Sequence, residues 1–409
     1  MERFEQQLEK YAELVVKMGI NVQPGQTLVV TASLEEAPFV RKVVKQAYEV
    51  GAKDVYVDWI DDEVRRIRLQ DAPFESLKEV QPWKVSGFEQ MAEEGAGFLS
   101  VYAPNPDLLN DVDGERFATA HRAGQTAMHK FREYIQNDRV SWSVVSVATE
   151  PWAKSLFPGE EINIAMEKLW DLIFMATRVS EDNPVAAWQA HIQDLQARLE
   201  YLNTNKFKKL HYKAPGTDLT IELPAGHKWL GGGAKTTGGV FFLPNMPTEE
   251  VFTVPLKTGV NGVVSSTKPL DFGGKLIENF SLTFENGRIV DVKAEQGYET
   301  LKSLVESDEG SHYLGEVALV PHDSPISNAG VVFKNTLFDE NASNHIAIGS
   351  AYPTCLEGGE AMSRDELEKL GVNSSVTHED FMIGSQHMDI DAETADGQRV
   401  PLFRNGNWV

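Results

Sequence analysis

The fold class is indicated first by the run Thr27-Leu28-Val29-Val30-Thr31, whose apolar and β-branched residues are typical of a buried strand. Residues 36–50 carry the apolar spacing of a helix that Gly51 ends, and residues 54–59, Asp-Val-Tyr-Val-Asp-Trp, repeat the strand pattern. Strands separated by helices form mainly parallel sheets that helices cover on both faces. The sequence therefore predicts an α/β fold for this part of the chain.

The alternation of strands and helices continues through the first half. Helical spacing recurs at residues 63–69, 88–94 and, as one long helix, 114–135, while further strands are predicted at 97–102 and 140–147. Two amphipathic helices, at 162–178 and 185–202, lead into a polar stretch at 203–206, where we place a domain boundary. No Gly-x-Gly-x-x-Gly follows the first strand, so a dinucleotide fingerprint is missing. Residues 1–205 are thus predicted to be an α/β N-terminal domain with a mainly parallel sheet, serving as a scaffold.

The second half, residues 206–409, has the short strands and turn signals of a β-rich α+β domain. Asn286-Gly287 between two apolar runs predicts a hairpin, because this pair accepts the positive φ angles of a type I′ turn. Helices are expected only at 298–306 and 363–370, the second with a capping box of Ser363 and Glu366. The glycine-rich run 231–239 fails the Walker A pattern because Ala234 stands before the lysine. We therefore expect a flexible or tightly turned loop there, at the rim of an active site, in place of a phosphate-binding loop.

Composition narrows the possible partners and compartments. A chain of 409 residues with 42% hydrophobic residues can build two cores. The formal net charge of −23 opposes binding to nucleic acid or to an anionic membrane. The single cysteine, Cys355, rules out an intrachain disulfide, and the start of the chain lacks the basic and apolar segments of a signal peptide. No window of about 20 apolar residues is available for a membrane span. We expect a cytoplasmic protein.

Residues able to hold metal ions gather in separated clusters of the second half. The chain lacks a His-Glu-x-x-His helix and a Gly-x-Ser-x-Gly elbow, and one cysteine cannot make a thiolate zinc site. What remains is a set of carboxylates and imidazoles spread over strands and loops, which is the kind of set that a pair of divalent cations requires. The candidate ligands are Glu250, Glu316, Glu340, His345, His378 and Asp380.

Local geometry supports some of these candidates. Glu249 and Glu250 follow Pro247, and in an extended chain their side chains point to opposite sides, so that one faces a site while the other faces away. His378 and Asp380 share one face if their segment is a strand. His387 and Asp389 have the same spacing, so spacing alone does not choose between the two pairs.

Five short motifs, in this order, resemble those of a known family. The motifs are Asn245-Met246-Pro247-Thr248-Glu249-Glu250-Val251, Gly315-Glu316, Asn344-His345-Ile346-Ala347, residues 349–352, and His378-Glu379-Asp380-Phe381-Met382-Ile383-Gly384. Together they resemble the thermophilic aminopeptidase family of metallopeptidases, the aminopeptidase T and aminopeptidase S group. The resemblance covers the full chain, including an α/β first half and a metal-bearing second half.

The resemblance implies an activity, a metal site and an assembly. The implied metal-site residues are Glu250, Glu316, His345, Tyr352, His378 and Asp380, with Glu340 as a further candidate. Glu316 would bridge two divalent cations per chain, which the family accepts as zinc, cobalt or magnesium and which ligand chemistry extends to manganese. The family members are intracellular, broad-specificity aminopeptidases that form homodimers and act on peptides with a free N-terminus.

We therefore interpret the sequence as that of a metal-dependent aminopeptidase that uses a water activated by a dinuclear site. Catalytic roles are expected for Glu316, for Tyr352 as a weak ligand or a donor to the oxyanion, and for Glu249 as general base. Two alternatives remain at this stage. One is another dinuclear hydrolase, either an amidase or a phosphoesterase; the other is a non-enzymatic two-domain binding protein whose acids hold structural cations.

Overall fold

A computed structural model describes residues 2–103, 105, 107–109, 111–272 and 275–409. The chain forms two compact units, each of which is considered by itself. The first unit comprises Met1–Gln189 and Gly233–Pro247, and the second comprises Ala190–Gly232 and Thr248–Val409. Separate folding of the halves 1–205 and 206–409 stays a prediction.

The first unit is built on a five-stranded sheet with the order β10-β4-β3-β1-β2. All of its neighbouring strands are parallel, which confirms the predicted sheet. Its last strand, β10, comes from beyond the first half of the sequence and joins the sheet beside β4. The strands of this unit are β1 (Thr27–Ser33), β2 (Asp54–Ile60), β3 (Gly97–Val101), β4 (Trp142–Val145), β8 (Ala234–Lys235), β9 (Phe241–Phe242) and β10 (Asn245–Met246).

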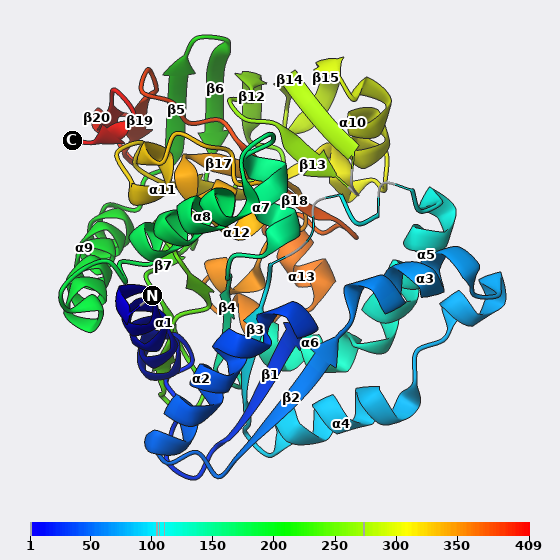
Figure 1. Ribbon diagram of the computed structural model, residues 1–409. Coiled ribbons are helices and arrows are strands. Elements are labelled where there is room, and N and C mark those ends of the chain that lie inside the picture. Colours follow the sequence, from blue (N-terminus) through cyan, green and yellow to red (C-terminus); the bar gives the residue numbers. More distant parts are fainter. Residues whose placement is uncertain (1, 104, 106, 110, 273–274) are drawn as a thin grey trace. The chain divides into compact units, whose positions relative to one another are not determined.

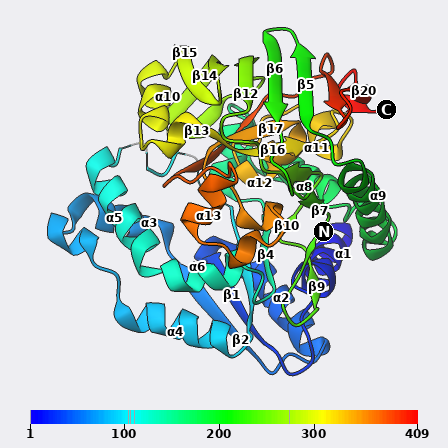
Figure 2. The ribbon, with the colours of Figure 1, turned by 180° about the vertical axis from the view of Figure 1, so that it is seen from behind.

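Helices cover both faces of this sheet (Figures 1 and 2). They are α1 (Glu2–Leu14), α2 (Ala37–Glu49), α3 (Asp62–Asp71), α4 (Pro82–Glu93), α5 (Gly114–Ala127), α6 (His129–Gln136), α7 (Glu150–Leu156) and α8 (Ile162–Ala176). The ring of Phe131 on α6 packs edge-to-face against Phe88 of α4 and Phe98 of β3, and the rings of Phe88 and Phe98 stack on each other. Elsewhere in the unit, Tyr11 of α1 packs between Phe39 of α2 and Phe174 of α8. Aromatic burial thus fixes the helices against the sheet.

The prediction of one helix over 114–135 is wrong, because two helices occupy that stretch. α5 ends at Ala127, and α6 begins at His129. Between them Met128 has φ −89° and ψ 9°, which is outside the helical range. Gly124 and Thr126 in the preceding turn have low helix propensity, so the local sequence does little to stabilise a continuous helix at Met128.

The second unit contains two antiparallel sheets, which confirms the prediction of a β-rich second half. One is a five-stranded sheet with the order β18-β17-β16-β11-β7; the other is a nine-stranded sheet in which β5, β6, β12 and β14 stand side by side (Figure 1). The predicted hairpin is β14–β15, and Asn286 and Gly287 have φ of 49° and 83° as a type I′ turn requires. The strands are β5 (Lys209–Ala214), β6 (Thr217–Glu222), β7 (Leu230–Gly231), β11 (Val251–Thr253), β12 (Val260–Ser265), β13 (Leu270–Phe272), β14 (Lys275–Glu285), β15 (Arg288–Gln296), β16 (Leu314–Leu319), β17 (His345–Gly349), β18 (His378–Met382), β19 (Asp389–Glu393), β20 (Arg399–Arg404) and β21 (Asn407–Trp408).

Helices of the second unit are short apart from the end of a long one. α9 (Pro184–Asn205) enters this unit from Ala190 onward and buries Leu195 and Leu202 in its core. The predicted helices appear as α10 (Tyr298–Val305) and α13 (Arg364–Lys369), and the Ser363–Glu366 capping box is present. Two single-turn helices were not foreseen, α11 (Pro325–Asn328) and α12 (Thr336–Asp339). Among the described residues, no helix of the chain is both long and apolar enough to span a bilayer.

Candidate metal centre

Three neighbouring strands, β16, β17 and β18, place the candidate ligands on one face of the five-stranded sheet. Glu316 lies opposite Ala347, and Ala347 lies opposite Asp380, so the two acids flank a small residue. Because side chains alternate along a strand, Val317, Ile346 and Phe381 point to the other face, where they belong to the core. The pairing of strands therefore gathers acids on one side and apolar residues on the other.

A β-bulge at Gly315 turns Glu316 toward this face. Leu314 pairs with Ile348 and Glu316 pairs with Ala347, so Gly315 is an extra residue in β16. Without the bulge, Leu314 and Glu316 would share a face, because they are two residues apart. A Cβ atom at residue 315 would lie 2.2 Å from the backbone oxygen of Ser350, which leaves room only for glycine.

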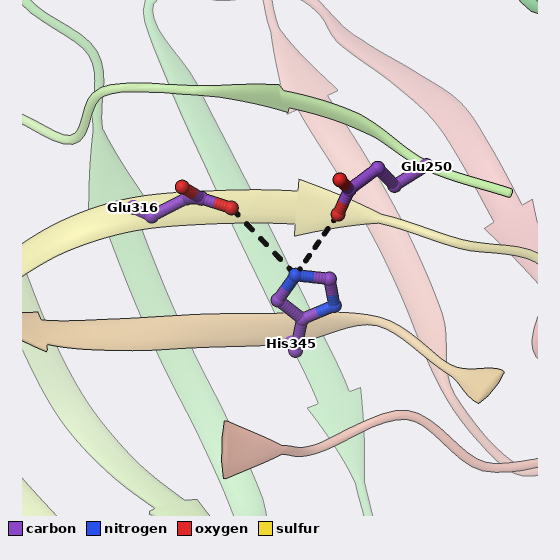
Figure 3. Close-up of side chains that lie close together, drawn as sticks. All are labelled: Glu250, Glu316 and His345. Atoms are coloured by element: carbon purple, nitrogen blue, oxygen red, sulfur yellow. Dashed lines mark ion pairs between the residues drawn. The ribbon is translucent and has the colours of Figure 1, made fainter. Parts of the chain in front are cut away.

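Glu250 reaches the same region from the segment just before β11, which pairs with β16 on its other side. Figure 3 shows the carboxylates of Glu250 and Glu316 converging on the ring of His345. The Nε2 atom of His345 lies 3.1 Å from Glu250 Oε2 and 3.6 Å from Glu316 Oε1. These three residues form a first group whose potential ligand atoms lie within 4.8 Å of one another.

A second group shares Glu316 with the first. Glu316 Oε2 lies 3.6 Å from Nε2 of His378, and that nitrogen lies 3.5 Å from Asp380 Oδ2. Each oxygen of the Glu316 carboxylate thus faces a different imidazole, and each imidazole faces a further acid. The geometry is that of two adjoining groups of potential ligands with the Glu316 carboxylate in common.

Both imidazoles are held in the orientation that metal ligation needs. His345 Nδ1 lies 3.1 Å from the backbone oxygen of Ser343, and His378 Nδ1 lies 2.6 Å from that of Ser350. An Nδ1–H that donates to a carbonyl leaves the Nε2 lone pair directed at the carboxylates. A nitrogen lone pair and carboxylate oxygens repel each other at such distances unless a proton or a cation lies between them. The donor set therefore fits a divalent metal.

The electrostatics of the cluster show the same excess of negative charge. Burial, with a contribution from the Asp380 carboxylate, raises the pKa of Glu316 to about 7, although His345 opposes this rise. Burial and the charges of Glu250 and Asp380 raise the pKa of Glu340 as well. Burial would lower the pKa of His378, but Asp380 and Glu316 outweigh it and raise that pKa to about 10. Glu316 and Glu340 thus retain protons more readily than free carboxyl groups do, or attract cations in their place.

Tyr352 lies beside the second group. Its ring packs edge-on against His378 at 4.9 Å between centroids and lies 6.1 Å from the ring of Phe252. Desolvation, followed by the charges of Glu316 and Asp380, raises the pKa of its phenol, so the hydroxyl keeps its proton. Its side chain is nevertheless 39% exposed, which leaves it open to a bound molecule.

Glu340 and Glu249 are linked through Asn341, and neither belongs to the two groups. The Asn341 side chain donates to Glu340 Oε1 at 3.3 Å and accepts the Glu249 backbone N–H at 2.7 Å. Glu340 still lies within electrostatic range of Glu250, Glu316 and Asp380. Glu249 is buried, and its Oε2 lies 3.4 Å from Nε2 of His191.

His191 is a neighbour of the site that the sequence did not reveal. It lies on α9, and its Nε2 atom is 2.8 Å from the backbone oxygen of Thr248 as well as near Glu249. A histidine on an amphipathic helix more than fifty residues away carries no local signal of this contact. Only the fold brings it to the Glu249-Glu250 segment.

The fold places the two His-x-Asp pairs in different surroundings. His378 and Asp380 meet Glu316, whereas His387 and Asp389 line a separate cavity of about 520 Å³ on the nine-stranded sheet. That cavity also contains Lys213 and Arg399. Its mixed charges distinguish it from the acidic cluster.

Comparisons with known proteins identify the family of this chain. The model of the thermophilic metalloprotease family, M29, matches residues 4–408. Aminopeptidase AmpS of Bacillus subtilis (strain 168) is 58% identical over 409 residues, and aminopeptidase T of Thermus thermophilus is 44% identical over 409 residues, with 100% of both chains covered in each case. The solved structure of wild-type AmpT from Thermus thermophilus matches with a TM-score of 0.94 at 44% identity, over 99% of this chain and 100% of that one. The chain therefore belongs to the M29 family of thermophilic metalloproteases.

Proposed function

We propose that the chain releases the first residue of peptides by means of a water activated at a dinuclear metal site centred on Glu316. The observation that carries this proposal is the position of the Glu316 carboxylate, whose two oxygens each lie 3.6 Å from a different imidazole Nε2. The assignment of the chain as a metalloaminopeptidase does not depend on this observation. By family and by its full-length relatives, the chain is a metalloaminopeptidase, which overturns the non-enzymatic alternative.

The proposed ligand sets follow the two groups of residues. Glu250 and His345 would hold one cation, His378 and Asp380 the other, and Glu316 would be shared. With Glu340, these residues include four carboxylates, whose formal charge of −4 two divalent cations would balance. Divalent cations at such a site act as Lewis acids toward a carbonyl and lower the pKa of a nearby water from 15.7 toward about 7. Oxygen and imidazole donors suit zinc, cobalt, manganese or magnesium.

The surrounding residues supply proton transfer and orientation. Glu249 is the proposed general base; it is buried next to the ligand Glu250, and the His191 contact holds its side chain. The protonated phenol of Tyr352 would donate to the oxyanion that forms at the scissile carbonyl. The free α-amine of a peptide would bind a cation of the site or an acidic side chain beside it, which would limit cleavage to the first bond.

The experiment that tests this function compares matched substrates with and without metal. Leucyl-p-nitroanilide should be hydrolysed, N-acetyl-leucyl-p-nitroanilide should not, and p-nitrophenyl phosphate should be inert. A chelator should abolish turnover, and Zn²⁺, Co²⁺, Mn²⁺ or Mg²⁺ should restore it. Equal turnover of the acetylated and free substrates would contradict recognition of the amine, and phosphate release would favour the phosphoesterase alternative.

Two further properties are part of the proposal. We propose that the chain is a homodimer, on the basis of its resemblance to the family, and sedimentation velocity should then give a mass near twice 45.5 kDa. We also propose a cytoplasmic location, which agrees with a single cysteine that is buried and unpaired. Cell fractionation tests this location.

A further inference from the structure

The first unit contains a cavity of about 580 Å³ that the proposed chemistry does not use. It lies among residues of α3, α5 and α6, together with Ile60 at the end of β2. The lining residues are Ile60, Arg65, Arg68, Leu69, Phe117, Ala120, His121, Gly124, Gln125, Met128 and Arg132.

The ionisable side chains of this cavity are all basic or neutral. Three arginines and one histidine line it, and no aspartate or glutamate occurs among these lining residues. This local excess of positive charge is unexpected in a chain whose formal net charge is −23. An excess of one sign in a concave region attracts ligands of the other sign.

Arg132 carries a charge that the described part of the protein does not neutralise. Its Nη2 atom donates to the backbone oxygen of Gln125, which is a neutral partner. Its Nε atom is buried and has no hydrogen-bond partner among the described residues. Burial accordingly lowers the pKa of the Arg132 guanidinium. A partly buried guanidinium without an anion loses hydration that nothing replaces, and a bound anion would offset that loss.

Arg65 and His121 line the same cavity as Arg132. The Arg65 side chain is exposed, and within the described ranges no hydrogen bond or ion pair engages it. Burial, followed by the charges of Arg65 and Arg132, lowers the pKa of His121. This shift favours the neutral imidazole, whose Nε2 atom lies 3.2 Å from the Gln125 side chain and can accept or donate a hydrogen bond.

The cavity lining also includes apolar residues. Leu69 is buried, and the Phe117 ring stacks on the His121 imidazole at 5.7 Å between centroids. Ile60 and Met128 are further apolar residues of the lining. A ligand that fills the cavity would thus place an apolar group beside Phe117 and Met128 and a charged group beside the arginines.

We propose that this cavity binds a small organic anion, in which a carboxylate or phosphate group is attached to an apolar body. Guanidinium groups are matched to such oxyanions, because their planar N–H donors can form paired hydrogen bonds. The ammonium group of a free amino acid or peptide N-terminus would meet cations here without a balancing acid. The cavity is therefore a site for a different ligand from that of the metal cluster in the second unit.

The proposal is tested by calorimetric titration of the full chain with 4-phenylbutyrate, phenyl phosphate, inorganic phosphate and the neutral 4-phenylbutanol. Both apolar anions should bind saturably and more tightly than inorganic phosphate, and the alcohol should not bind. Their relative affinities distinguish a carboxylate ligand from a phosphate ligand. Absence of binding by both apolar anions at millimolar concentration, or equal binding of the alcohol, would overturn the proposal.

Matched variants locate the bound anion. Arg132→Gln should weaken binding about tenfold or more, as expected for loss of a charge-assisted hydrogen bond. Arg122→Gln is the control, because Arg122 is exposed on the same helix as His121 but does not line the cavity. If Arg132→Gln does not fold by circular dichroism, the exposed Arg65→Gln replaces it. Equal loss of binding in the control and the cavity variants would contradict the assigned location.

Discussion

The acidic cluster of the second unit and the arginine cavity of the first unit are opposites in charge and in construction. In the cluster, paired strands hold carboxylates and imidazoles 3.1–3.6 Å apart. In the cavity, side chains from three helices surround about 580 Å³ of open space. Both regions gather charge of one sign, which is mostly buried in the cluster and exposed or partly buried in the cavity. The difference indicates that the cluster suits small cations, whereas the cavity suits a larger anion.

The rigidity of the two regions also differs. Glu316, Ala347 and Asp380 are fixed by hydrogen-bonded neighbours on both sides of β17. Arg65 and Arg132 extend from α3 and α6, and their long side chains can adapt to a ligand. Chemistry that depends on distances of a few tenths of an ångström is thus expected at the sheet, and tolerant binding is expected at the helices.

The largest effect should come from Glu316→Gln, which removes a charge from the carboxylate that both groups share. We expect the rate of leucyl-p-nitroanilide hydrolysis to fall roughly a thousandfold or more, because metal affinity and charge stabilisation are lost together. Metal analysis of the purified variant should show fewer cations per chain. Glu299→Gln on α10, an exposed acid outside the cluster, is the control.

The Glu316→Gln variant also tests whether the metal cluster and the arginine cavity are separate binding sites. Binding of 4-phenylbutyrate should be the same in Glu316→Gln and the wild type, since the cavity lies in the other unit. A parallel loss of anion binding would show that the anion occupies the metal cluster. An active variant with a full complement of metal would remove Glu316 from its proposed role.

A smaller loss is expected for Glu249→Gln. If Glu249 is the general base, kcat should fall about a hundredfold or more while the bound metal is retained. Glu200→Gln, an exposed acid on α9, should leave kcat unchanged. Unaltered turnover in Glu249→Gln would show that Glu249 is not the general base. Glu340→Gln is the variant to measure in that case.

The smallest predicted effect is a change of stability with pH in the metal-free chain. The pKa of Glu316 is raised to about 7 and that of His378 to about 10, so the folded state binds more protons than the unfolded state. Their contribution to stability is present at low pH and is lost as the pH rises through those values. Thermal unfolding from pH 5.5 to 8.5 should show the metal-free chain losing about 1–3 kcal/mol relative to the metal-loaded chain. A gap that narrows with rising pH would contradict these shifts.

Much of the fold could be predicted because it follows from local patterns. The alternation of strands and helices predicted the parallel sheet, and Asn286-Gly287 predicted the hairpin. The pairing of β10 with β4 in the first sheet could not be predicted, because a strand of two residues has too short a sequence pattern to identify its partner strand. The break at Met128 depends on packing as well as on helix propensity, so periodicity alone missed it.

The candidate metal centre was predictable to the extent that its residues lie in short motifs. The sheet brings together Glu250, Glu316, His345, His378 and Asp380, and the alternation of strand side chains explains why the last two share a face. The bulge at Gly315 and the contact of His191 are tertiary features with no sequence period. The arginine cavity lacks a motif altogether, because its residues lie on three separate helices.

The most direct test of the dinuclear assignment is a crystal structure of the chain loaded with Zn²⁺ or Co²⁺, with anomalous diffraction recorded at the metal edge. We predict two anomalous peaks about 3.5–4 Å apart, one on each side of the Glu316 carboxylate. The Nε2 atoms of His345 and His378 should lie about 2.0–2.1 Å from different peaks. A single peak, or peaks remote from Glu316, would contradict the account.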